Sequence, residues 1–181
     1  MTALRLVPER DWHVDWLPGD FPVPLTLMLG RFRLVPLTPG WNEEDYRAVM
    51  ASRSMLCNLF RQRDSWPAVN HSRARNHDDL AWHESEFRQR RSFAWAVLDE
   101  QYNYLGCVYL YPGRVPAAGA EAFFWIRRDD AHWHSRELVL QQLLQDWFRH
   151  WPLEAVIFPG RSMPWHRWQA SHWRYYGEVW R

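Results

Sequence analysis

Apolar positions along the chain predict a strand, loop, helix and strand between residues 120 and 161. The helix is expected over Arg136–Trp151, because apolar residues recur there at i, i+3, i+4, i+7 and i+8 along one face. The flanking strands, Ala120–Arg128 and Glu154–Phe158, contain continuous apolar runs, as expected of strands covered on both faces. Together they form a βαβ unit. The polar loop Asp129–Ser135 leads into the helix N-terminus, a place that can hold an anion or serve only as scaffold.

The remaining pattern predicts a strand, two helices and an antiparallel hairpin ahead of this unit. The expected ranges are Leu25–Leu37, bent at Gly30, for the strand, Asn42–Leu56 and Asp78–Arg91 for the helices, and Ser92–Leu98 with Tyr104–Tyr111 for the hairpin. Residues 58–77 are basic and contain helix-breaking residues. Two interpretations of them stay open, a solvated surface loop and a loop on the substrate side.

These elements predict one α/β (α+β) domain over residues 25–161, with a mixed, mostly antiparallel sheet flanked by helices. Residues 1–24 are rich in proline and predict an irregular N-terminal arm. Residues 162–181 are rich in tryptophan and predict a C-terminal tail that completes the domain or packs on it. Aromatic tails also pack against second subunits, which makes a homodimer a candidate assembly.

The composition narrows the classes of function. The 22 basic residues are all arginine, so no lysine can form a Schiff base or a P-loop phosphate contact. Pyridoxal-phosphate chemistry and Walker-type nucleotide hydrolysis are therefore excluded. A net charge of +1 argues against a protein that binds nucleic acid by bulk charge.

Metal and membrane functions find little support in the sequence. His132-Trp133-His134 places two imidazoles close together, but no third and fourth ligand follow at a zinc spacing, so we expect no metal. Cys57 and Cys107 suggest no disulfide framework. No signal peptide and no apolar run of membrane-spanning length are apparent, so we expect a cytoplasmic protein without a membrane segment.

The order of elements, with the residues that carry it, resembles the GCN5-related N-acetyltransferase (GNAT) superfamily over roughly residues 27–161. The Leu105-Gly106 step stands where these proteins usually have a glycine at the start of a strand. The matching stretches are Arg31–Leu37, Phe93–Asp99, Tyr104–Leu110, Ala120–Arg128 and Leu138–Phe148.

The resemblance implies a GNAT-like sheet that opens in a V between its fourth and fifth strands, where acetyl-CoA binds. The pantetheine arm would pair with backbone at Phe124, Trp125 and Ile126. The pyrophosphate would lie on the following loop and helix start, at Arg128, Trp133, His134, Ser135 and Arg136. It also implies Glu121 as a candidate general base, and Tyr175 or Tyr176 as a candidate proton donor to the leaving thiolate. The implied activity is N-acetyl transfer from acetyl-CoA to a small-molecule or peptide amine.

The chain departs from the superfamily at the pyrophosphate loop. That loop typically reads Gln/Arg-x-x-Gly-x-Gly/Ala, whereas this chain has Trp133 and Ser135 at the glycine positions and adds Asp129 and Asp130. Glycine allows backbone to approach phosphate closely, whereas the neighbouring arginines could compensate by charge. The alternative is a catalytically inactive domain of the same fold that serves as a ligand-binding or interaction module.

Overall fold

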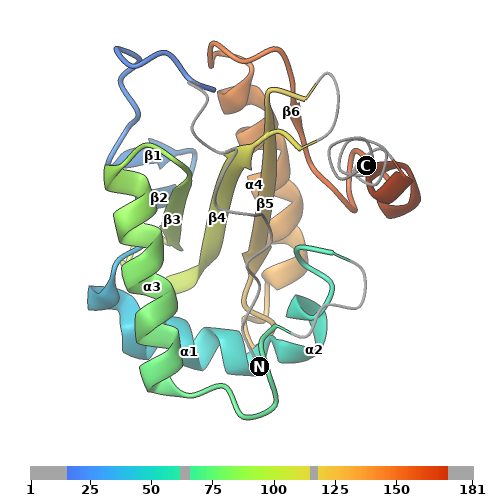
Figure 1. Cartoon of the computed structure of the whole chain (residues 1–181). Coiled ribbons are helices and arrows are strands. Elements are labelled where there is room, and N and C mark those ends of the chain that lie inside the picture. Colours follow the sequence, from blue (N-terminus) through green and yellow to red (C-terminus); the bar gives the residue numbers. More distant parts are fainter. Residues whose placement is uncertain (1–15, 62–65, 115–117, 171–181) are drawn as a thin grey trace, which may run out of the picture.

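The computed structural model describes residues 16–61, 66–114 and 118–170, which form a six-stranded sheet in the order β1-β2-β3-β4-β5-β6 (Figure 1). Neighbouring strands run antiparallel from β1 to β5, and β6 runs parallel to β5. The strands are β1 (Leu27–Leu29), β2 (Phe32–Pro36), β3 (Phe93–Leu98), β4 (Tyr104–Pro112), β5 (Ala120–Ile126) and β6 (Val156–Ile157). This confirms the mixed, mostly antiparallel sheet with a central βαβ unit.

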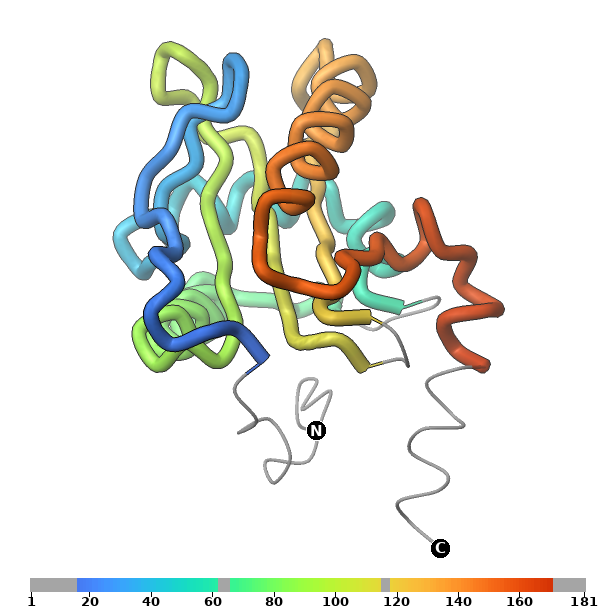
Figure 2. The backbone as a smooth tube through the Cα atoms, turned by 90° about the horizontal axis from the view of Figure 1, so that it is seen from above, coloured from blue at the N-terminus to red at the C-terminus, as the bar shows by residue number. Residues whose placement is uncertain are grey.

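Helices cover both faces of the sheet, with α3 and α4 on opposite sides (Figures 1 and 2). Leu140, Leu144 and Phe148 of α4 pack with Phe124 in one core. The second core joins α1, α2 and α3 to the other face, where Trp125 lies. The helices are the 3₁₀ helix η1 (Pro39–Trp41), α1 (Asn42–Ala51), α2 (Arg53–Leu56), α3 (Arg73–Arg88) and α4 (Trp133–Phe148).

The strand predicted over residues 25–37 is instead the β1–β2 hairpin. Leu29 pairs with Phe32, so the chain reverses at Gly30 rather than bending there. Gly30 has a φ of 60°, a conformation that glycine adopts without strain. A Cβ at this position would also lie 2.8 Å from Leu143 Cδ1 of α4.

Several helix boundaries differ from the predicted ones, and α3 and α4 both end three residues early, at Arg88 and Phe148. The first helix is interrupted at Ser52, which separates α1 from α2. The helix predicted from Asp78 begins at Arg73, where the Ser72 hydroxyl accepts a hydrogen bond from the Arg75 N–H over 3.2 Å. Part of the segment left open as a loop is therefore helical. The last helix begins at Trp133, three positions before the predicted Arg136.

The described parts of the two terminal segments contact the body of the protein. Trp16 donates from its indole nitrogen to the Arg90 carbonyl, and its ring lies 5.6 Å from that of Phe93. Residues 165–170 are helical, and Trp168 there is buried. The β1–β2 hairpin and this C-terminal helical segment lie at opposite ends of the sheet (Figure 2). Within the described residues, no helix is long and apolar enough to cross a membrane.

Candidate active site

The parallel strands β5 and β6 separate after a very short contact. Only Ala120 and Glu121 of β5 pair with β6, opposite Val156 and Ile157. The Ala120 N–H donates to the Ala155 carbonyl ahead of β6, whereas the Arg127 N–H donates to Leu105 of β4. Because strand backbone alternates in direction, even-numbered residues of β5 turn their polar groups to the β6 side. From Ala122 to Ile126 this side pairs with no strand among the described residues, which is the V-shaped divergence that the resemblance implied.

The three residues predicted along the pantetheine arm do not share one orientation. Phe124 and Ile126 turn their backbone groups to the diverging edge. Trp125 pairs with Cys107 of β4 and turns its backbone the other way. Its indole nitrogen donates to the Tyr109 hydroxyl over 3.3 Å in the second core. Of these three residues, only Phe124 and Ile126 therefore present backbone at this edge.

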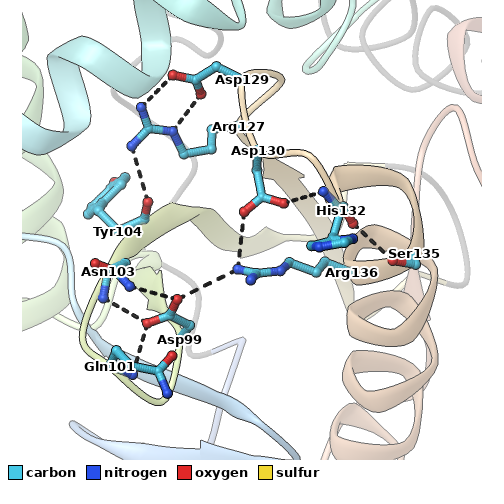
Figure 3. Close-up of polar contacts among 10 residues, drawn as sticks. All are labelled: Asp99, Gln101, Asn103, Tyr104, Arg127, Asp129, Asp130, His132, Ser135 and Arg136. Atoms are coloured by element: carbon cyan, nitrogen blue, oxygen red, sulfur yellow. Dashed lines mark hydrogen bonds and ion pairs between the residues drawn. The ribbon is translucent and has the colours of Figure 1, made fainter.

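The loop after β5 neutralises its own acidic residues (Figure 3). Arg127 donates to both oxygens of Asp129, each over 2.6 Å. These hydrogen bonds and the charge of Arg127 hold the pKa of Asp129 below its usual value, although burial acts in the opposite direction. Asp130 accepts from the His132 N–H over 2.7 Å and lies 3.2 Å from Arg136 Nη1. The negative charges of Asp129 and Asp130 are therefore both compensated by arginines.

Arg136 also faces the turn between β3 and β4. Its Nη1 lies 3.8 Å from Asp99 Oδ2. Asp99 accepts hydrogen bonds from the backbone of Gln101 and Asn103 and from the Asn103 side chain (Figure 3). Burial alone would raise the pKa of Asp99, but the hydrogen bonds and the charge of Arg136 outweigh it and lower that pKa.

The glycine-free loop reaches the helix without positive φ angles anywhere in residues 127–136. The conformational freedom of glycine is therefore not required here. The α4 N-cap, His132, makes no side-chain capping bond. The exposed first turn carries His134 and Ser135, and the Ser135 hydroxyl donates to the His132 carbonyl over 3.0 Å. First-turn N–H groups have no acceptor of their own within a helix and favour anions. Here the Trp133 N–H donates to the Asp130 carbonyl ahead of the helix over 3.2 Å.

A pair of arginines shares one carboxylate beside this loop, and only Arg128 was predicted there. Arg128 donates to Glu137 Oε2 over 2.7 Å, and its guanidinium carbon lies 3.6 Å from the centre of the Trp133 ring. Arg161, which follows β6, donates to the other oxygen of Glu137. The sequence analysis did not identify Glu137 or Arg161. Glu137 stands three positions before the buried Leu140 and so lies on the inner face of α4, which is the one signal that the sequence offers for it.

Glu121, the predicted base, has a fully engaged carboxylate. Its oxygens accept from the Arg114 side chain over 2.8 and 2.6 Å, from the Arg114 N–H over 3.0 Å and from the Trp168 indole over 3.0 Å. Glu121, Arg114 and Trp168 are all buried. This arrangement joins β5 to the chain after β4 and to the C-terminal helical segment. Tyr175 and Tyr176 lie outside the described residues.

Another buried carboxylate lies beside the second core. Asp45 of α1 accepts from the Tyr104 hydroxyl over 2.5 Å and from Asn76 Nδ2 of α3 over 2.8 Å. Burial raises the pKa of Asp45 and that of Cys107, whose sulfur lies 3.5 Å from the same carboxylate. These contacts fix α1 and α3 on the sheet. No group of three or more His, Cys, Asp or Glu in the described ranges could hold a metal.

No protein-family model matches the chain, and no curated protein matches it. Solved structures do. One is the Ribosomal-protein-S5-alanine acetyltransferase from Vibrio fischeri, with a TM-score of 0.56 and 10% identity over 82% of each chain. Another is the Microcin C7 self-immunity acetyltransferase MccE in complex with acetyl-CoA and AMP, with a TM-score of 0.52 and 10% identity over 70% of this chain and 67% of that one.

A third similar structure is the acetyltransferase from Salmonella typhimurium that modifies the N-terminal serine of the 50S ribosomal subunit protein L7/L12. It has a TM-score of 0.52 and 11% identity over 74% of this chain and 73% of that one. At such identities the likeness establishes a shared fold.

Proposed function

We propose that this chain, which has the fold of the GNAT acetyltransferases, transfers an acetyl group from acetyl-CoA to an amine. The observation that carries the proposal is the divergence of β5 from β6 after Glu121, directly ahead of an uncapped helix N-terminus. A strand edge offers paired donors and acceptors to the amides of a pantetheine arm. A helix start offers N–H groups to a pyrophosphate. The acetyl-CoA complex of a protein with the same fold supports this choice of ligand.

In this proposal the backbone of Phe124 and Ile126 holds the pantetheine arm. The first turn of α4, at Trp133, His134 and Ser135, holds the pyrophosphate. Arg136 adds charge there by exchanging its present carboxylate partner for phosphate, and Arg128 adds charge while it keeps its contact to Glu137. The amine nitrogen then attacks the thioester carbon, the carbon–sulfur bond breaks, and the thiolate of CoA leaves. The amine proton passes to a base, and the thiolate takes up a proton.

The assignment of catalytic residues is part of the proposal. Glu121 lies on β5 beside the divergence and is the candidate base, directly or through a water molecule. Its hydrogen bonds to Arg114 and Trp168 must loosen for it to accept a proton. Tyr175 or Tyr176 is the candidate donor to the thiolate.

The acceptor is proposed to be a peptide amine or a small-molecule amine. Proteins of the same fold include one that modifies an N-terminal serine of a ribosomal protein, which favours peptides in a first screen. A mixture of peptides with free N-termini, compared with the same peptides N-acetylated, would report acceptor-dependent release of CoA. A homodimer remains part of the proposal, and light scattering of the full chain tests it.

Calorimetric titration of the full chain with acetyl-CoA and with CoA is the decisive test. We expect micromolar dissociation constants that weaken about tenfold in Arg128→Ala and Arg136→Ala, in line with the loss of a charge-assisted contact. Arg149→Ala is the matched control, because Arg149 follows α4 at its other end and its side chain is 72% exposed. Absence of binding at millimolar cofactor would refute acetyl transfer and leave the alternative, a ligand-binding or interaction module.

A further inference from the structure

Arg161 lies across the diverging edge of β5. It follows β6 in a tight turn, in which the Gly160 N–H donates to the Met163 carbonyl over 2.8 Å and the Met163 N–H donates to Phe158 over 3.2 Å. Gly160 has a φ of 76°, and a Cβ there would lie 2.5 Å from the Trp165 ring. Only glycine fits this position. The turn therefore holds the backbone of Arg161 in a fixed place beside β5.

The guanidinium of Arg161 is engaged by two different elements. It donates to the Phe124 carbonyl of β5 over 3.3 Å, and its carbon lies 3.9 Å from the centre of the Phe124 ring. It also donates to Gln141 Oε1 of α4 over 3.3 Å and to Glu137. Arg161 thus joins β5 to α4 across the side of β5 on which the described residues pair no strand. Phe124 is one of the residues that present backbone to that side.

We propose that Arg161 is a latch that closes this edge in the unliganded chain and must release the Phe124 carbonyl before a pantetheine arm can pair there. The inference rests on the proposed binding of acetyl-CoA. A guanidinium that lies over the Phe124 ring and donates to the Phe124 carbonyl fills the space that an amide of the arm would enter. The Arg161 guanidinium and an amide of the pantetheine arm cannot occupy the same position at this edge together.

The ion pairs around Glu137 make release of Arg161 feasible. Glu137 is buried, so leaving its carboxylate without a partner would be costly. Arg128 holds the other carboxylate oxygen, however, so the charge of Glu137 stays paired when Arg161 leaves. The Arg161 side chain is 25% exposed and has a path to solvent. Arg128 and Arg161 contact the same carboxylate but have opposite proposed effects on the cofactor.

Titration of acetyl-CoA into the wild type and Arg161→Ala tests the latch. We expect Arg161→Ala to bind about tenfold more tightly than the wild type, whereas Arg128→Ala binds more weakly. Gln141→Ala removes one latch contact and keeps Arg161, so it should bind two- to threefold more tightly. Arg149→Ala controls for the loss of a positive charge near α4. Thermal unfolding of each variant is measured first, and Gln141→Ala decides the result if Arg161→Ala does not fold.

The outcomes separate the latch from the proposed function. Tighter binding by Arg161→Ala supports the latch. Equal or weaker binding by this variant, with micromolar binding by the wild type, overturns the latch and leaves acetyl-CoA binding intact. Weaker binding would make Arg161 a ligand contact. No binding by any variant at millimolar acetyl-CoA overturns both the latch and the acetyltransferase proposal.

Discussion

The backbone N–H of Arg128 donates to the hydroxyl oxygen of Ser52 over 2.9 Å. Ser52 is fully buried at the junction where α1 ends and α2 begins. The hydrogen bond joins the loop after β5 to the opposite layer of the fold. The break in the helix that was predicted to be continuous thus gives the candidate cofactor loop one of its fixed points.

Substitution Ser52→Ala removes this fixed point. The Arg128 N–H loses its acceptor, and an unsatisfied buried donor costs about 1–3 kcal/mol. We expect a loss of that size in the free energy of unfolding, measured by urea denaturation, and several-fold weaker binding of acetyl-CoA. Ser54→Ala is the control, because Ser54 is exposed on α2. Equal stability of the two variants would show that the hydrogen bond does not anchor the loop.

The buried ion pair of Glu121 and Arg114 predicts a large effect of Glu121→Gln on folding. Removal of one charge leaves the Arg114 guanidinium buried without its counter-ion, which costs about 3–5 kcal/mol. We expect a loss of unfolding free energy in this range. The double variant Arg114→Met/Glu121→Met should recover part of it, because no buried charge is then left unpaired.

The same variant tests the role of Glu121 as a base. A base role predicts a loss of about 10²–10⁴-fold in kcat, together with loss of the corresponding limb of the pH–rate profile. A positioning role predicts lower stability with an unchanged pH profile. Glu154→Gln is the control, since Glu154 is exposed ahead of β6.

Substitution Asp130→Asn should strengthen cofactor binding. Asparagine keeps an oxygen that can accept from the His132 N–H, but it removes the negative charge 3.2 Å from Arg136. Removal of one charge near the surface is worth about 1 kcal/mol, so we expect about fivefold tighter binding of CoA at low salt. The difference should shrink as salt increases. Asp146→Asn, at the exposed far end of α4, is the control; weaker binding by Asp130→Asn would contradict this prediction.

The local pattern of apolar residues was sufficient to predict the sheet and its central βαβ unit. The continuous apolar runs of β3, β4 and β5 correspond to strands buried almost throughout. The start of α3 was missed because its first turns are polar and give no apolar face. Asn76 there is nevertheless buried, and it bonds to Asp45 of α1, 31 positions away, which only folding brings near it.

Only those residues of the candidate site whose positions follow from the order of the elements could be predicted. Phe124 and Arg128 could be placed because one lies in a strand that precedes a helix and the other follows that strand. Arg161 could not, since its contacts to Phe124 and Glu137 join residues 37 and 24 positions apart. The pairing of Asp129 with Arg127 was likewise not visible in the sequence, where the negative charge of Asp129 argued against an anion site. The ion pair compensates that charge.

The half-buried ring of His83, on α3, predicts a pH dependence of stability. Burial lowers its pKa to about 3 from 6.5, and its ring lies 5.2 Å from that of Tyr109. The folded chain keeps His83 neutral, whereas the unfolded chain takes up a proton below about pH 6.5. The contribution of His83 to the free energy of unfolding is therefore complete above pH 6.5 and is lost as pH falls toward 3, by about 1.4 kcal/mol per pH unit.

Urea denaturation between pH 7.5 and 5, above the range in which ordinary carboxylates titrate, should show this loss in the wild type. His83→Phe should flatten the slope, and His150→Phe, at an exposed position, should not. An identical slope in the wild type and His83→Phe would mean that His83 is not held neutral by the fold.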